Sequence, residues 1–251
     1  PKVSVRREER LRALALGVNH ACMLSMEGKA YCWGANFQTT LGNGRTDTAS
    51  AVVPVPVAGD FRFATITAGS HTCGLTSDGV AYCWGQNSTG AIGDNTRGDL
   101  LVRPVPTRVA SGATRFSQLA AGLSSTCALD QVGSAYCWGD LGDDERLALT
   151  PARMTASKPF VHIVASYHAC ALAADGSAYC VGGNRYGQLG NGSASASTVN
   201  STRFLPVSGS LVFSSLSAGP QHTCGVTSLK RVYCWGRNSS GQLGDGTSAD
   251  R

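Results

Sequence analysis

The chain has 251 residues, of which 42% are hydrophobic and only 15% charged, with 31 glycines and a formal net charge of +5. This composition is typical of a turn-rich β protein, and no apolar run approaches the length of a membrane helix, so membrane insertion by this segment is not expected. Positive charge gathers at residues 6–12, where two glutamates interrupt it. That pattern favours a solvated arm over an anion-binding patch, because nucleic-acid-binding surfaces usually show denser Lys/Arg runs with interleaved aromatic residues.

Five copies of one motif follow one another along the chain. The second copy, residues 68–85, reads AGSHTCGLTSDGVAYCWG, and its relatives lie at residues 16–34, 121–139, 165–182 and 218–236. The first cysteines of the copies fall at positions 22, 73, 127, 170 and 224, a period of about fifty residues with one short unit. Such a period predicts a repeat architecture.

Within each unit the expected elements follow in the same order. Two cysteine-bearing strands come first, then a polar loop of the type NxxGQLGDGT, seen at residues 184–193 and 238–247. A proline-bearing strand such as residues 53–57 follows, and a phenylalanine then opens a short apolar run such as residues 63–66. Four strand-length pieces bounded by Gly, Pro and Asn turns predict a four-stranded blade. In the third unit, residues 140–149 replace the glycine-rich loop.

The ten cysteines fall into five pairs that each bracket a hairpin. In the second unit the loop Ser77-Asp78-Gly79, with Gly in the left-handed position, makes Thr76 face Val80, and counting outward places the two cysteines opposite each other. Opposed Cβ atoms lie about 4.5–5.5 Å apart, within reach of a disulfide after modest adjustment. The predicted bridges are Cys22–Cys32, Cys73–Cys83, Cys127–Cys137, Cys170–Cys180 and Cys224–Cys234. Lys230 stands where the other turns have glycine, which predicts a strained or a different fifth turn.

Metal binding is the alternative for these cysteines. His71 shares a strand face with Cys73 and Cys83, and three such ligands could hold zinc. In the third unit Ser125 replaces the histidine while both cysteines remain, so disulfides are favoured and no metal or cofactor is expected. The histidines are interpreted as hydrogen-bonded packing residues. The acidic cluster at residues 143–145 is interpreted as solvated, with calcium binding as the less favoured alternative.

The elements AGxxHTC, DGxxYCWG and GQLGDGT recur in order over essentially the whole chain, and they closely resemble the regulator of chromosome condensation repeat family. The resemblance implies an all-β fold: a β-propeller of about five four-stranded blades, either a complete ring or part of a seven-bladed one. A single domain is expected, with units near residues 11–57, 58–107, 108–154, 155–207 and 208–251 and with residues 1–5 as a completing strand.

Four tryptophans occupy equivalent positions and are expected to pack blade against blade: Trp33, Trp84, Trp138 and Trp235. Val181 stands at this position in the fourth unit. A light-sensing or ligand-caging tryptophan cluster is the less favoured interpretation.

Disulfides persist in oxidising compartments, so the cysteine pattern predicts a secreted or cell-surface protein. Glycosylation sequons in the predicted loops agree with this, although loops rich in Asn and Ser also create them by chance. The candidate acceptors are Asn87, Asn191, Asn200 and Asn238.

No motif points to catalysis, and the glycine-rich loops lack the Lys-Ser/Thr and helix of a phosphate loop. The favoured hypothesis is a non-catalytic extracellular or cell-surface module, binding or structural, that presents blade loops to a protein or carbohydrate partner. The cysteine-bearing repeats resemble those of Crinkly-type receptor ectodomains, and such a module is expected to belong to a longer polypeptide or assembly. The alternatives are a guanine-nucleotide exchange factor for a small GTPase and a proteinaceous enzyme inhibitor.

Overall fold

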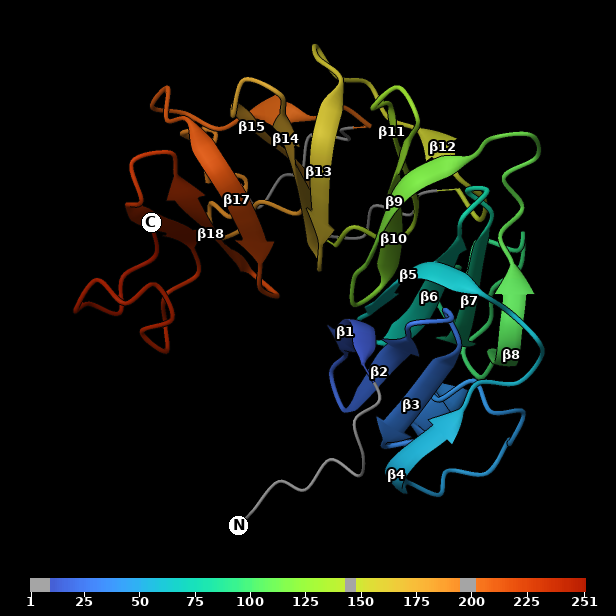
Figure 1. Ribbon diagram of the computed structural model, residues 1–251. Coiled ribbons are helices and arrows are strands. Elements are labelled where there is room, and N and C mark those ends of the chain that lie inside the picture. Colours follow the sequence, from blue (N-terminus) through green and yellow to red (C-terminus); the bar gives the residue numbers. More distant parts are fainter. Residues whose placement is uncertain (1–9, 143–147, 195–201) are drawn as a thin grey trace.

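The computed structural model describes residues 10–142, 148–194 and 202–251, in which nineteen strands form five antiparallel sheets (Figure 1). The predicted all-β fold of repeated blades is confirmed. The first blade contains β1 (Leu11–Leu16), β2 (His20–Ser25), β3 (Ala30–Gly34) and β4 (Ala51–Pro56), with the short 3-10 helix η1 (Phe37–Thr39) in its loop. The second contains β5 (Phe63–Ala68), β6 (His71–Thr76), β7 (Ala81–Gln86) and β8 (Val102–Arg108).

The third blade contains β9 (Phe116–Ala121), β10 (Ser125–Asp130), β11 (Ala135–Gly139) and β12 (Ala152–Arg153). The fourth contains β13 (Phe160–Ala165), β14 (His168–Ala173), β15 (Ala178–Gly182) and β16 (Leu205–Pro206). The fifth contains three strands in the described residues: β17 (Phe213–Ala218), β18 (His222–Thr227) and β19 (Val232–Gly236). Arg251 exchanges two backbone hydrogen bonds with Gly236, of 2.7 and 3.0 Å. In the first two blades the equivalent glycine pairs with the fourth strand.

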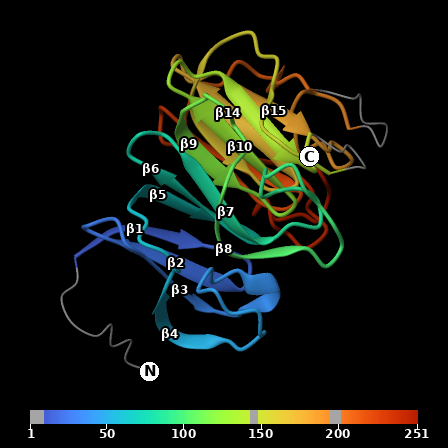
Figure 2. The same cartoon turned by 90° about the vertical axis from the view of Figure 1, so that its right-hand side faces the viewer.

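The blades follow one another along an open arc, with the first and fifth at its two ends (Figure 1). The first strands of neighbouring blades contact each other, from β1 through β5, β9 and β13 to β17, and so line the inner side of the arc. Turned by 90°, the first blade again lies at one end of the stack (Figure 2). The five blades therefore do not close into a ring. The expected completing strand at residues 1–5, the acidic cluster at 143–145 and the sequon at Asn200 lie outside the described residues.

Each blade carries one disulfide at the predicted register. Cys73 faces Cys83 across β6 and β7, and the other four pairs repeat this, with Cα atoms 4.0–4.1 Å apart. The turn glycines have φ of 78–80°, and Lys230 takes φ of 63° at the same position. Of the two predicted outcomes for the fifth turn, the structure therefore has the strained one.

The core lies between the blades rather than within them. Strands β10 and β14 are buried on both faces, because a blade packs on each side of them, and apart from Asp130 and His168 at their ends they consist of small and apolar residues. In the fifth blade, β18 alternates between buried and partly exposed positions, because no further blade covers it in the described part of the chain. None of the described residues forms a helix with the length and apolar character needed to span a bilayer.

Candidate binding surface

The seam between neighbouring blades is held by one repeated hydrogen-bond network. Between the second and third blades, Nε2 of His71 lies 2.7 Å from Oγ1 of Thr126, and that hydroxyl donates to the carbonyl of Ala91 at 2.7 Å. The same carbonyl accepts from Nε1 of Trp138 at 2.9 Å. A hydroxyl has one proton to give, so His71 must donate through Nε2. We call this set the seam network.

The network recurs in the first and fourth seams. His20 bonds to Thr72 at 2.7 Å and His168 to Thr223 at 2.6 Å. The threonine and the tryptophan of each following blade again share one carbonyl, that of Thr40 in the first seam and that of Gln188 in the fourth. The threonines were missed at the sequence level, although they stand directly before the first cysteine of their units.

Burial keeps these histidines neutral. It lowers the pKa of His20 to about 4, of His71 to about 3 and of His168 to about 4. Nδ1 of His168 is buried without a partner in the described residues, so a proton placed there would find no acceptor. In the described part of the chain, no group of three or more His, Cys, Asp or Glu side chains could hold a metal ion.

The third seam has lost the whole network at once. Ser125 replaces the histidine, Ala169 the threonine and Val181 the tryptophan. Phe204 enters this seam from the fourth unit, is buried, and packs on Phe160 with ring centroids 4.9 Å apart. Ser125, which favoured disulfides over zinc at the sequence level, thus departs from the repeat together with the residues that a histidine there would have met across the seam.

Three tryptophans are buried in separate seams, and each packs on a phenylalanine of its own blade. The ring centroids of Trp84, Trp138 and Trp235 lie 5.8, 6.0 and 5.7 Å from those phenylalanines. Trp33 is half-buried on the first blade, where no blade precedes it in the described residues. Among the described residues no two tryptophan rings pair with each other, so the structure does not assemble them into a cluster.

The sequon asparagines at two positions are anchors of their own loops. Asn87 and Asn238 are fully buried, and their side-chain amides donate within the loop, for example from Asn87 to the carbonyl of Thr96 at 3.0 Å. A glycan on either nitrogen would have to displace these hydrogen bonds. Asn191 is half-buried and accepts hydrogen bonds through Oδ1.

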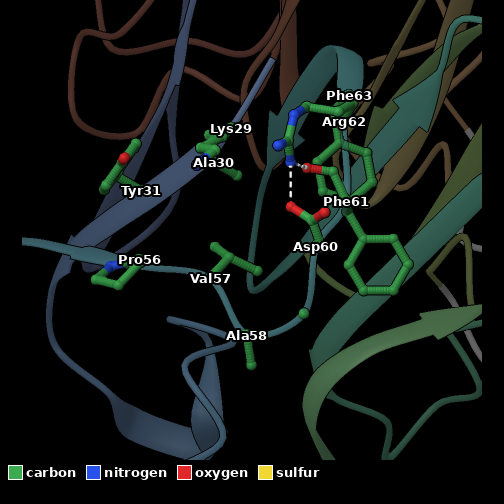
Figure 3. Close-up of a pocket in the computed structure, with 11 residues that line it drawn as sticks. Lys29, Ala30, Tyr31, Pro56, Val57, Ala58, Asp60, Phe61, Arg62 and Phe63 are labelled. Atoms are coloured by element: carbon green, nitrogen blue, oxygen red, sulfur yellow. Dashed lines mark hydrogen bonds and ion pairs between the residues drawn. The ribbon is translucent and has the colours of Figure 1, made fainter. Parts of the chain in front are cut away.

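A small pocket of about 150 Å³ lies at the outer rim, where the first blade leads into the second (Figure 3). Lys29 and Tyr31 lie on one side of it, and the ion pair of Arg62 with Asp60, 2.6 Å long, lies on the other. Both members of that pair are exposed, so it contributes little to stability. A larger hollow of about 490 Å³ occupies the equivalent place between the third and fourth blades.

A third pocket, of about 220 Å³, lies in the first seam among the loops on either side of the cysteine hairpins. We call it the first-seam pocket; its polar side chains are Asn19, His20, Gln38, Thr40, Ser70 and Gln86, and Phe37 stands beside them. The loop that forms one wall is strained, because Gln38 and Thr39 take φ of 55° and 62°. Left-handed φ is uncommon outside glycine and is an outlier for a β-branched residue.

Comparison with known proteins identifies the repeat and a similar protein. A family model of the regulator of chromosome condensation (RCC1) repeat matches residues 12–38, 69–91, 166–188 and 213–242, and a second model of this repeat matches residues 27–75. The chain is 35% identical over 257 aligned residues to the ultraviolet-B receptor UVR8 of Arabidopsis thaliana; the match covers 96% of this chain and 56% of the receptor. The chain thus spans little more than half the length of this relative.

Two solved structures share the fold. Human WBSCR16 matches with a TM-score of 0.81 at 18% identity, over 96% of this chain and 65% of that one. The ectodomain of the receptor kinase CR4 from Physcomitrella patens matches with a TM-score of 0.59 at 23% identity, over 94% and 56%.

Proposed function

Because the chain belongs to the regulator of chromosome condensation (RCC1) repeat family, we propose that it is a non-catalytic, extracellular or cell-surface binding module whose blade loops contact a protein or carbohydrate partner. The observation that carries the proposal is the set of five disulfides, one in each blade. Bonds of this kind persist in oxidising compartments and are rare in the cytosol.

The position of the disulfides supports a structural role for them. Eight of the ten cysteines are fully buried, and those of the second blade share a core cluster with Phe116 and Trp138 of the third. A hairpin closed over so few residues contributes about 2–3 kcal/mol per bridge. The bridges therefore stabilise the hairpins on which each following blade packs.

The contrast between buried histidines in the seams and variable loops at the surface supports binding rather than catalysis. The buried histidines, the candidates for acid–base chemistry, take part in packing the seams and are held neutral. The loops that vary between units lie at the surface, where recognition residues are commonly placed. One of the solved structures that share the fold is a receptor ectodomain, which is the kind of module that we propose here.

Intact mass under non-reducing and reducing conditions tests the proposal. The chain, produced through a secretory route, is expected to gain two hydrogens for each of five bridges on reduction and to melt at a lower temperature. A matched serine pair in place of Cys73 and Cys83 should reproduce part of that loss. If all the cysteines of the secreted protein were free thiols and reductant left its stability unchanged, an extracellular role would be contradicted. That result would favour a protein of a reducing compartment, where a guanine-nucleotide exchange factor would act.

A further inference from the structure

The first-seam pocket is lined by six uncharged polar side chains, and three of them have no hydrogen-bond partner within the described chain. The side chains of Asn19, Gln38 and Ser70 make no hydrogen bond in the described residues. Gln86 donates a hydrogen bond through Nε2 to Oγ of Ser88 at 2.9 Å, so its side-chain carbonyl oxygen is left to accept from another partner. Among the residues that the structure describes, no Asp, Glu, Lys or Arg lines the pocket. Several donors and acceptors therefore converge without a formal charge among them.

An exposed aromatic ring stands beside these groups. Phe37 is 61% exposed, and the equivalent positions of the second, fourth and fifth loops hold Ser88, Arg185 and Ser239. Leaving a phenylalanine in water forgoes the stabilisation that its burial would give. Among the four loops compared, the first is the one with an apolar ring at this position.

The backbone of the same loop is strained in a way that the other loops avoid. Thr39 takes φ of 62°, where the equivalent residues are Gly90, Gly187 and Gly241 with φ of 72–86°. Thr39 is also 97% buried, with its hydroxyl unpartnered in the described residues. Strain of this kind persists where the surroundings enforce it and is concentrated at ligand-binding sites. Here it holds Phe37 and Gln38 at the mouth of the pocket.

From these three observations we propose that the first-seam pocket binds a neutral sugar residue of a glycan. Amides and hydroxyls match the hydroxyl groups of a pyranose, which both donate and accept hydrogen bonds. The face of Phe37 suits the apolar C–H face of the ring, and the volume of about 220 Å³ admits a single sugar ring rather than a longer segment. The inference deepens the proposed function, on which it rests, by naming the ligand class and the seam.

Other ligand classes fit the lining less well. A phosphate, sulfate or uronic acid would call for an arginine or lysine, and none of the described ones lines the pocket. A purely apolar ligand would bury the amides of Asn19 and Gln38 without partners, which is costly. A neutral polyhydroxylated ring satisfies both constraints.

The test uses the full, disulfide-bonded chain with cellohexaose, mannohexaose and chitohexaose as neutral probes and an oligogalacturonide as the acidic one. Saturation-transfer NMR and titration calorimetry measure binding. We expect at least one neutral probe to bind, and we expect Phe37→Ser and Gln38→Ala each to weaken it about tenfold. Val161→Ser removes an equally exposed apolar side chain from the fourth blade and should leave binding unchanged.

Three results would overturn the inference: no binding of any neutral probe, binding of the acidic probe alone, or neutral binding that both pocket variants leave intact. Phe37 and Gln38 lie at the surface, and thermal melting of each variant shows that the fold is retained. The disulfide measurement above is independent of these probes, so an absent sugar site and a failed extracellular role are distinguished.

Discussion

Replacing Thr39 by glycine should stabilise the protein, because this residue combines two unfavourable features. Its left-handed backbone, φ 62°, costs a residue with a Cβ about 1–2 kcal/mol. Its buried hydroxyl, without a partner in the described residues, costs about 1–3 kcal/mol more. Thr39→Gly removes both penalties.

Two opposing effects reduce the gain. Glycine gives the unfolded chain more freedom, worth up to about 1 kcal/mol, and the buried methyl group of Thr39 contributes roughly 0.8 kcal/mol that is lost. The expected net stabilisation is about 1–2 kcal/mol, or a rise of roughly 2–8 °C in melting temperature for a chain of this size.

Urea denaturation, monitored by tryptophan fluorescence, measures the change in stability. Trp84 reports on this loop, because its indole N–H donates a hydrogen bond to the carbonyl of Thr40, the residue next to Thr39. Gly241→Thr is the reverse control: it introduces the same residue into the fifth loop, where φ is 72° and an added Cβ meets no atom closer than 4.0 Å, so backbone strain should destabilise the protein. If Thr39→Gly lowered the urea midpoint, the loop would not be strained in the way argued, and the case for a strained binding loop would fall with it.

Three further outcomes are expected, each measured as urea midpoints. Thr126→Ala should lower the free energy of unfolding by about 1–3 kcal/mol, because it leaves the buried Nε2 of His71 without a hydrogen-bond partner. In a protein that already carries His71→Ser, the same substitution should have little effect. If the effects of the two substitutions added up, the seam network would be contradicted. Lys230→Gly should stabilise the fifth turn by about 1 kcal/mol while Lys230→Ala does not, and equal effects would exclude relief of backbone strain. The pKa values of His20, His71 and His168, lowered to about 4, 3 and 4, lie below the value of about 6.5 in the unfolded chain. The unfolded chain therefore binds more protons, and the free energy of unfolding should fall as the pH falls from 6.5 to 4. A free energy of unfolding that does not change over this range would contradict the neutral burial of these histidines.

The hairpin register was predictable because it depends on local spacing. A turn glycine and a strand period of two residues place Cys73 opposite Cys83 whatever the rest of the molecule does. The sequence also identified Lys230 as an exception, since a side chain there conflicts with the backbone that the turn requires.

The partners across each seam could not be obtained in the same way. His71 and Thr126 are separated by 55 positions, and only the docking of two blades brings them together. A hint was present, because Ser125 and Ala169 depart from the pattern in consecutive units. The strain at Thr39 also escaped prediction, since the first loop matches the polar motif loosely enough to conceal the missing glycine.

The disulfides have a mechanical consequence, because each one joins residues ten positions apart in one hairpin and none joins two blades. A chain stretched from its ends would yield seam by seam, one blade after another. Each bridge would then withhold ten residues from the released length, roughly 35 Å per blade at full extension. The bridges would thus set how far an unfolded blade can extend, while the force that releases it would depend on the non-covalent seams.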